Sequence, residues 1–260
     1  MGMKKKQTKK VYELILPFLL PVLFILIWFI WTLILNPKTI LPSPFEIIDK
    51  ALSMTANRQL GEYTLITLKR ALAGFLIGGG SGFLLGLANG ILRPADISLN
   101  PTIRIFRNIP VLVFLTFVIL LFGTGERVKI ILVAADVFFP IYINTYGGIK
   151  SMDKGLIDMG KAYGLNNLAL LKELVFPGAF FSLFTSIRQS LRTMWTVLIA
   201  IEIIIPDKGI GSMALSAVKS AQMDQLAISI ILYAVLSKLS DGIAGAFERR
   251  VLSWKTDLKI

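Results

Sequence analysis

The sequence predicts an all-α, polytopic membrane protein with about six transmembrane helices. Its mean hydropathy of +0.71 and its 55% share of apolar residues are high, since soluble domains are roughly 45–50% apolar on a broader count. Two uncharged runs, 14–35 and 71–92, each exceed the roughly 20 residues that a helix needs to cross the hydrocarbon core. We therefore expect one transmembrane domain over 14–247, between cytoplasmic tails at 1–13 and 248–260.

The first predicted span, 14–35, follows a lysine-rich tail, so a secretory signal peptide is the alternative. Signal-peptide cores are only roughly 7–15 residues long and are followed by small residues. Here the apolar run is longer, and it ends with the bulky Trp28, Phe29 and Trp31 before Asn36. We therefore expect a retained spanning helix.

The second span, 71–92, has a glycine at every fourth position of one helix face. Glycine lets helix backbones approach closely, which predicts a packing face. The alternative is a surface that slides during gating. The stripe consists of Gly74, Gly78, Gly82, Gly86 and Gly90.

Four further apolar runs are shorter or contain charges. They are Ile109–Gly123, Val128–Ile149, Arg192–Pro206 (extending back through Arg188) and Leu226–Phe247. Charges inside lipid are costly and indicate function or polar contact between helices. The candidates are Asp136, Glu202, Lys238 and Asp241. Lys238 and Asp241 stand at i, i+3 and could pair with each other, whereas Glu202 either anchors neighbouring helices or lines a pathway.

The charge distribution predicts the topology. With the N-terminus inside, the inner segments hold twice as many lysines and arginines as the outer ones, which places both termini in the cytoplasm. The segments 45–60 and 210–222 then lie outside, and both have apolar residues at helical spacing. They are expected to rest on the headgroups or, alternatively, to form a docking surface for an extracytoplasmic protein.

Several functional classes are excluded by composition. The chain has no cysteine and no histidine, which excludes thiol chemistry and removes the commonest general base and metal ligand. No acid pair, phosphate-binding loop or metal-ligand spacing stands out, so we expect no catalytic, cofactor-binding or metal-binding residues. The net charge of +12 does not indicate nucleic acid, because the basic residues cluster at the ends of apolar runs. The expected surroundings are a lipid bilayer.

The charged interruption at 150–177 looks suited to contact another protein. Leu156, Met159 and Tyr163 follow a helical spacing, and Gly164 can end that helix with a positive φ. Asn166 and Asn167 suit a turn and an N-cap. A second short helix is expected over Leu168–Phe176, with Pro177 ending it or opening the next helix. An ordinary connecting loop is the alternative.

This elbow resembles the E-A-A loop of bacterial ABC-importer permeases. Asp158-Met159-Gly160 stands at E-A-A, Gly164 at the glycine of the pattern, Leu174 at its isoleucine and Phe176-Pro177 at its L-P. Other stretches resemble the nitrate/sulfonate/taurine branch of the family. They are Leu41–Pro44, Arg70–Phe75, Arg107–Pro110, Phe122–Glu126, Phe139–Gly148, Glu202 and Gly209–Gly211.

The resemblance implies a type I importer permease in the cell membrane, a transport subunit and not an enzyme. The elbow would be the coupling helix that seats on an ABC ATPase subunit, where ATP and Mg would bind. Its coupling residues would be Asp158, Met159, Gly160, Ala162, Tyr163, Gly164, Leu174, Phe176 and Pro177. A second permease copy, forming a homodimer, and an extracytoplasmic substrate-binding protein are the other implied partners. The expected substrate is a small anionic nutrient of the nitrate, taurine or alkanesulfonate type. A vitamin precursor and a gradient-driven secondary carrier are the alternatives.

Overall fold

The computed structural model describes residues 16, 19–32, 34 and 41–251, and in this part of the chain every regular element is a helix. The all-α prediction is therefore confirmed. The two tails and the ends of the first predicted span lie outside the described residues. The labelled helices are α2 (Pro44–Ala56), α3 (Gln59–Ile91), α4 (Arg93–Arg107), α5 (Phe114–Phe122), α6 (Glu126–Lys150), α7 (Lys154–Ala162), α8 (Asn167–Leu170), α9 (Phe176–Ile204), α10 (Ile210–Lys219) and α11 (Met223–Val251).

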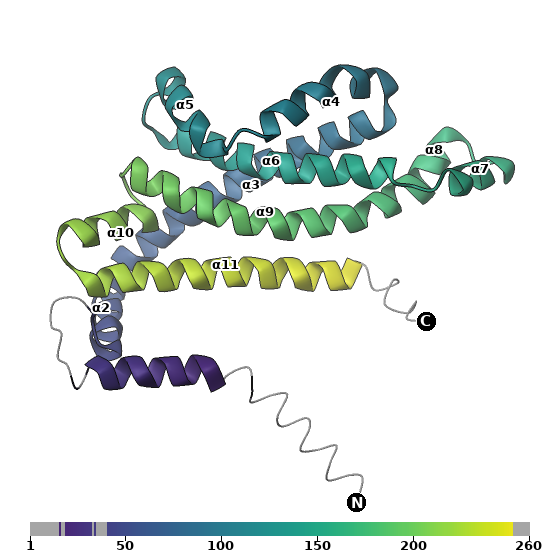
Figure 1. Ribbon diagram of the computed structural model, residues 1–260. Coiled ribbons are helices and arrows are strands. Elements are labelled where there is room, and N and C mark those ends of the chain that lie inside the picture. The colour runs from purple at the N-terminus through teal and green to yellow at the C-terminus, as the bar shows by residue number, and fades with distance from the viewer. Residues whose placement is uncertain (1–15, 17–18, 33, 35–40, 252–260) are drawn as a thin grey trace, which may run out of the picture.

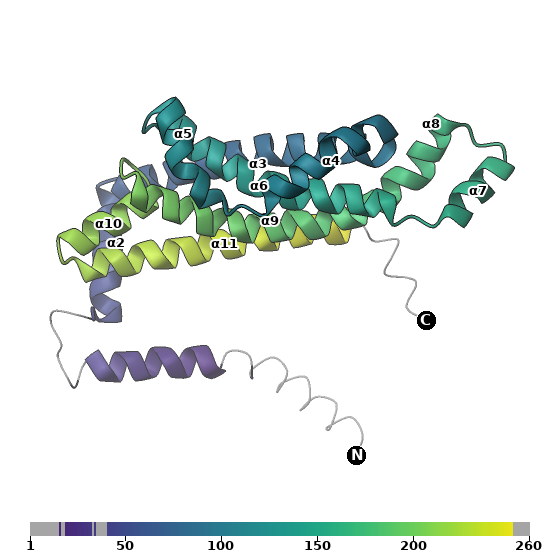
Figure 2. The same ribbon diagram turned by 45° about the horizontal axis from the view of Figure 1, so that its top comes forward.

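The centre of the molecule is formed by α3, α6 and α9. Helices α6, α9 and α11 run side by side (Figures 1 and 2), and α3 packs lengthwise along α6. Helices α7 and α8 project beyond one end of this bundle, while α2 and α10 lie at the other (Figure 1). The elbow and the two predicted outer segments thus occupy opposite ends, as the predicted topology requires.

Three helices, α3, α6 and α11, are long and apolar enough to cross a membrane. A fourth span is possible if α4 and the segment Val111–Phe122 are taken as one span bent by 83°. A shorter apolar helix, Leu19–Thr32, contains part of the first predicted span, and its Phe29 packs edge-on against Phe45 of α2. The predicted number of six spans remains a prediction.

The glycine stripe of α3 faces α6. A Cβ atom built on Gly78 would lie 2.1 Å from the carbonyl oxygen of Ala134, and one on Gly82 would lie 2.6 Å from that of Phe138. A Cβ on Gly86 would lie 2.7 Å from the carbonyl oxygen of Tyr142, whereas Cβ atoms on Gly74 and Gly90 would meet the side chains of Val133 and Ile149. The two backbones are therefore in direct contact, which only glycine permits at these positions.

Helices α2 and α10 differ in how deeply their apolar side chains are buried. A capping box begins α2, with Ser43 and Glu46 each accepting the other's backbone N–H, and Phe45 stays exposed beside it. By contrast, Ile210 and Met213 of α10 are fully buried. Helix α10 is therefore part of the core packing against α9 and α11, in addition to any contact with headgroups.

Candidate functional site

The elbow begins with α7, a short helix with one packed and one open side. Asp153 caps its start by accepting the backbone N–H of Gly155 at 2.8 Å. Gly160 lies on the packed side, where an added Cβ would be 2.7 Å from Leu170 and 3.1 Å from Leu174. This glycine therefore allows α7 to lie close to the second half of the elbow.

Gly164 ends α7 in the left-handed conformation, with a φ of 83°, as expected. The N–H of Leu165 donates to the carbonyl of Gly160 at 3.0 Å, and that of Gly164 donates to Lys161 at 2.9 Å. This pair of bonds defines a Schellman motif, which satisfies carbonyls that the helix end would leave free. The angle between the two halves of the elbow is thus set by hydrogen bonds.

The second half of the elbow differs from the expected short helix over Leu168–Phe176. Asn166 caps it, its side chain accepting the N–H of Ala169 at 2.8 Å. One α-helical turn then passes into a π-helical turn, Leu171–Val175, and directly into α9. Pro177 lies in the first turn of α9, directly after the π-helical turn.

The open side of α7 is apolar. Leu156 is 44% exposed, Met159 52% and Tyr163 83%. Asp158 and Ala162 are exposed beside them, whereas Leu165 is half-buried. Large apolar side chains gathered on a projecting helix outside the bundle indicate a surface that contacts another protein.

Glu202 is fully buried at a junction of four helices. Its Oε1 accepts from Arg70 Nη1 at 2.7 Å and from Thr67 Oγ1 at 2.9 Å, both on α3. Its Oε2 accepts from the N–H of Gly211 on α10 at 2.8 Å and from the Tyr233 hydroxyl on α11 at 3.0 Å. Both carboxylate oxygens are satisfied by the protein, which supports the anchoring interpretation over a pathway-lining role.

Arg70 is the central cation of this junction, a role that we did not predict from the sequence. Its side chain is 2% exposed and also binds Glu126 at the start of α6 and the carbonyl of Lys208. In the topology prediction, Arg70 counts among the outer basic residues because it lies between the first and second predicted spans. Two sequence features could have indicated this role. Arg70 begins the motif R-A-L-A-G-F, and the carboxylates Glu126 and Glu202 lie near the ends of other spans.

The expected pair between Lys238 and Asp241 is replaced by contacts between helices. Asp241 of α11 accepts from Arg188 Nε at 3.0 Å and Nη2 at 3.2 Å, and Arg192 lies 3.4 Å away. Lys238 is exposed. A guanidinium offers two parallel donors to one carboxylate, which a lysine on the same helix cannot do.

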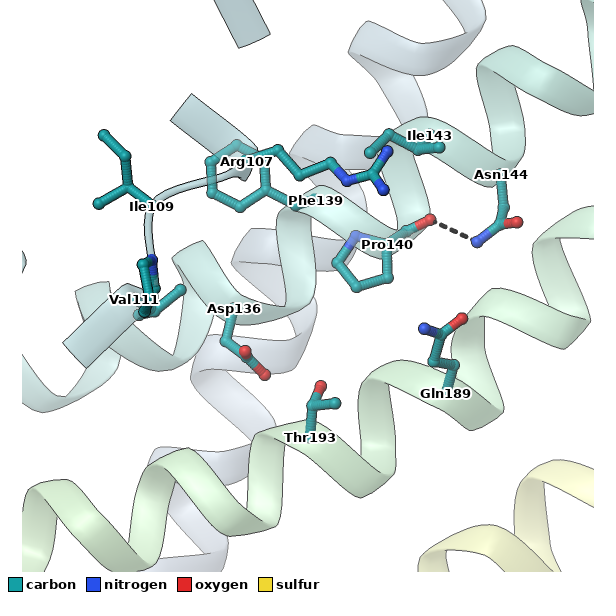
Figure 3. Close-up of a pocket in the computed structure, with 11 residues that line it drawn as sticks. Arg107, Ile109, Val111, Asp136, Phe139, Pro140, Ile143, Asn144, Gln189 and Thr193 are labelled. Atoms are coloured by element: carbon teal, nitrogen blue, oxygen red, sulfur yellow. Dashed lines mark hydrogen bonds between the residues drawn. The ribbon is translucent and has the colours of Figure 1, made fainter. Parts of the chain in front are cut away.

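Asp136 lines a cavity of 410 Å³ between the α4–α5 loop, α6 and α9. Figure 3 shows its carboxylate facing Thr193 of α9, with Arg107, Asn144 and Gln189 around the same space. The carboxylate oxygen Oδ2 is buried and has no hydrogen-bond partner among the described residues. Of the predicted intramembrane carboxylates, Asp136 is the one that borders this cavity and has a buried oxygen without a hydrogen-bond partner among the described residues.

No group of three or more His, Cys, Asp or Glu side chains suited to a metal ion occurs within the described ranges.

A protein family and several known proteins match this chain over most of its length. Residues 78–253 match the family model of the binding-protein-dependent transport system inner membrane component. The chain is 39% identical to the putative aliphatic sulfonates transport permease protein SsuC of Escherichia coli (strain K12), over 95% of this chain and 94% of that protein. It is 27% identical to the taurine transport system permease protein TauC of the same strain, over 92% of this chain and 89% of that protein.

A solved structure shares the fold. It is a crystal structure of an amino acid ABC transporter with histidines, aligned with a TM-score of 0.61 over 77% of this chain and 97% of that chain. The sequence identity is 17%, so this similarity concerns the arrangement of the helices alone.

Proposed function

Because this chain belongs to the family of inner membrane components of binding-protein-dependent transport systems, we propose that it is the permease subunit of an ATP-driven importer of small sulfonates. It is a membrane protein and a transport subunit, not an enzyme. The sulfonate class is supported by relatives that this chain matches over nearly its full length. A vitamin precursor, which the sequence left open, remains the alternative, because a riboflavin transport system permease protein is 29% identical to this chain over 91% of its length.

The observation that carries the coupling mechanism is the apolar face of α7. Leu156, Met159 and Tyr163 project from the end of the bundle on a helix whose angle is held by the Gly164 turn. A short amphipathic helix of this kind suits a groove on a partner protein. The proposed partner is an ABC ATPase subunit, which would hold ATP and Mg and hydrolyse the nucleotide.

The remaining partners follow from the same function. A second copy of the permease, giving a homodimer, would enclose the path together with this chain. An extracytoplasmic binding protein would deliver the substrate at the end of the bundle that carries α2 and α10. Alternating closure of the two ATPase subunits would then move the elbows and, through them, the spanning helices.

The test is reconstitution of the permease in liposomes with its ATPase and binding protein. We expect uptake of radiolabelled ethanesulfonate that requires ATP on the side of the membrane where the ATPase lies. The binding protein should stimulate ATP hydrolysis only when the permease is present. Uptake that continues without any ATPase subunit would contradict the proposal and favour a gradient-driven carrier.

A further inference from the structure

Helix α9 has a polar face that is open to its surroundings. Four exposed side chains follow one another at intervals of three or four residues, which places them on one side of the helix: Thr185, Gln189, Arg192 and Thr196. Helix α9 runs beside α6 and α11 (Figures 1 and 2), which are both long and apolar enough to cross a membrane. With 29 residues α9 is equally long, yet it is not among the described helices that are apolar enough.

Arg192 lies near the middle of this polar face and of the bundle. It is about 24 Å from the first residue of α9 and about 18 Å from the last. The adjacent Thr193 faces Asp136 (Figure 3), which is itself near the middle of α6. The Arg192 side chain is nevertheless 65% exposed. A guanidinium at this depth is costly in hydrocarbon, so this face of α9 borders water or another protein and not lipid.

The open side of α3 shows what a lipid-facing surface of this bundle consists of. Leu72, Leu76 and Ile77 lie near the middle of α3, and all three are exposed. Leucine and isoleucine favour the hydrocarbon core, whereas arginine disfavours it. The bundle therefore has an apolar surface suited to lipid on α3 and a polar surface that is unsuited to lipid on α9.

Arg192 is held more loosely than the neighbouring arginine. In the described part of the chain, the only hydrogen bond of its guanidinium is to Asp241 of α11, at 3.4 Å. Asp241 is already bound by Arg188, through Nε at 3.0 Å and Nη2 at 3.2 Å, and Arg188 also binds Glu248 at 3.2 Å. Two carboxylates thus neutralise Arg188, whereas Arg192 shares one carboxylate and keeps most of its five N–H donors for another partner.

We propose that the polar face of α9 lines the water-filled path and that Arg192 is the side chain that contacts the passing sulfonate. The inference rests on the proposed transport function and assigns a residue to it. Asp241 and Arg188 are positioning residues, because an anion can draw Arg192 away from Asp241 while Arg188 keeps that carboxylate paired. When the anion moves on, Arg192 returns to Asp241. Binding then stays weak enough for release, which passage through a membrane requires.

Thiol accessibility tests whether α9 faces water, because the chain has no cysteine of its own. Thr196→Cys lies one helical turn from Arg192, and Leu76→Cys, in the apolar surface of α3, is the matched control. The permease with its ATPase is placed in nanodiscs, and reaction with charged methanethiosulfonates, which do not enter hydrocarbon, is followed with and without ATP. We expect Thr196→Cys to react in at least one of these states and Leu76→Cys to remain unmodified.

A pair of oppositely charged reagents tests the role of Arg192. They are the sulfonatoethyl and trimethylammonioethyl methanethiosulfonates. A unit charge about 6 Å away, the separation of i and i+4 on a helix, changes each rate by about threefold in water, in opposite directions. Arg192→Gln should therefore lower the ratio of the anionic to the cationic rate at Thr196→Cys by about tenfold, while Arg192→Lys should retain most of it. Sulfonate uptake per ATP hydrolysed should follow the same order.

Two results would overturn the proposal. They are equal reactivity of Thr196→Cys and Leu76→Cys in every state, and a rate ratio that Arg192→Gln does not change. Thermal unfolding of each variant checks that the fold persists, and Gln189→Cys is the second reporter if Thr196→Cys does not assemble. ATP-driven ethanesulfonate uptake by the wild-type chain is measured separately, so intact uptake with an unreactive α9 face would refute this inference and leave the transport function standing.

Discussion

Replacing Gly164 tests whether the elbow couples ATP hydrolysis by the partner ATPase to movement of the membrane-spanning helices. At a φ of 83°, a β-branched valine would be strained by roughly 1–3 kcal/mol. Nothing lies within 4 Å of the position where its Cβ would be, so the expected cost comes from the backbone and not from a clash inside the chain. If the docked elbow must adopt this strained conformation, the strain reduces the free energy of ATPase binding. The affinity then falls by about 5-fold to 150-fold, since 1.4 kcal/mol is a factor of ten in a binding constant.

The assay is co-purification and titration of the ATPase on Gly164→Val, followed by binding-protein-stimulated ATP turnover in liposomes. Gly164→Asn is the matched control, because asparagine tolerates the left-handed conformation better than other residues with a side chain. We expect docking to follow the order glycine, asparagine, valine, with the thermal stability of the membrane bundle unchanged. Normal docking and normal stimulated turnover in the valine variant would refute the role of this turn in coupling.

Further predictions concern packing, the buried junction and the topology. Gly82→Leu should lower the thermal unfolding temperature of the purified protein, by the equivalent of about 1–3 kcal/mol or more, because the added side chain meets the α6 backbone; Gly80→Leu, on the open side of α3, should have little effect. Glu202→Ala should destabilise the fold by about 3–5 kcal/mol in the same measurement, because it breaks the buried ion pair with Arg70 and removes the acceptor of the Gly211 and Tyr233 donors, and wild-type stability would contradict the anchor. A single cysteine at Asn167 should be labelled only from the cytoplasm and one at Asn57 only from outside; the opposite pattern would invert the predicted topology.

The elbow could be predicted from sequence because its determinants are local. The positive φ of Gly164 and the cap at Asn166 depend on residues within a few positions of one another. The π-helical turn at Leu171–Val175 was not predicted, because nothing in its composition separates it from an ordinary helix. The glycine stripe could also be predicted, because a spacing of four residues places all of its glycines on one helix face.

The polar contacts between helices were harder to predict. Glu202 was identified as a buried charge, but its main partner, Arg70, is 132 positions away and was assigned to an outer segment. Asp241 was expected to pair within α11 and instead binds Arg188 of α9. Residue spacing identifies neighbours on the same helix only. Partners on other helices cannot be predicted until the packing of the helices is known.

Helix α9 connects the elbow directly to the buried junction around Glu202. It continues for 29 residues from the π-helical turn to the end that carries Glu202, a length of about 43 Å. Rotation of such a rod by about 5° around its base would move the far end by nearly 4 Å, more than the length of a hydrogen bond. Because Glu202 is tied to α3, α10 and α11, that movement could not be taken up by α9 alone. A small torque applied at the elbow would therefore have to move the ends of four helices around Glu202 together.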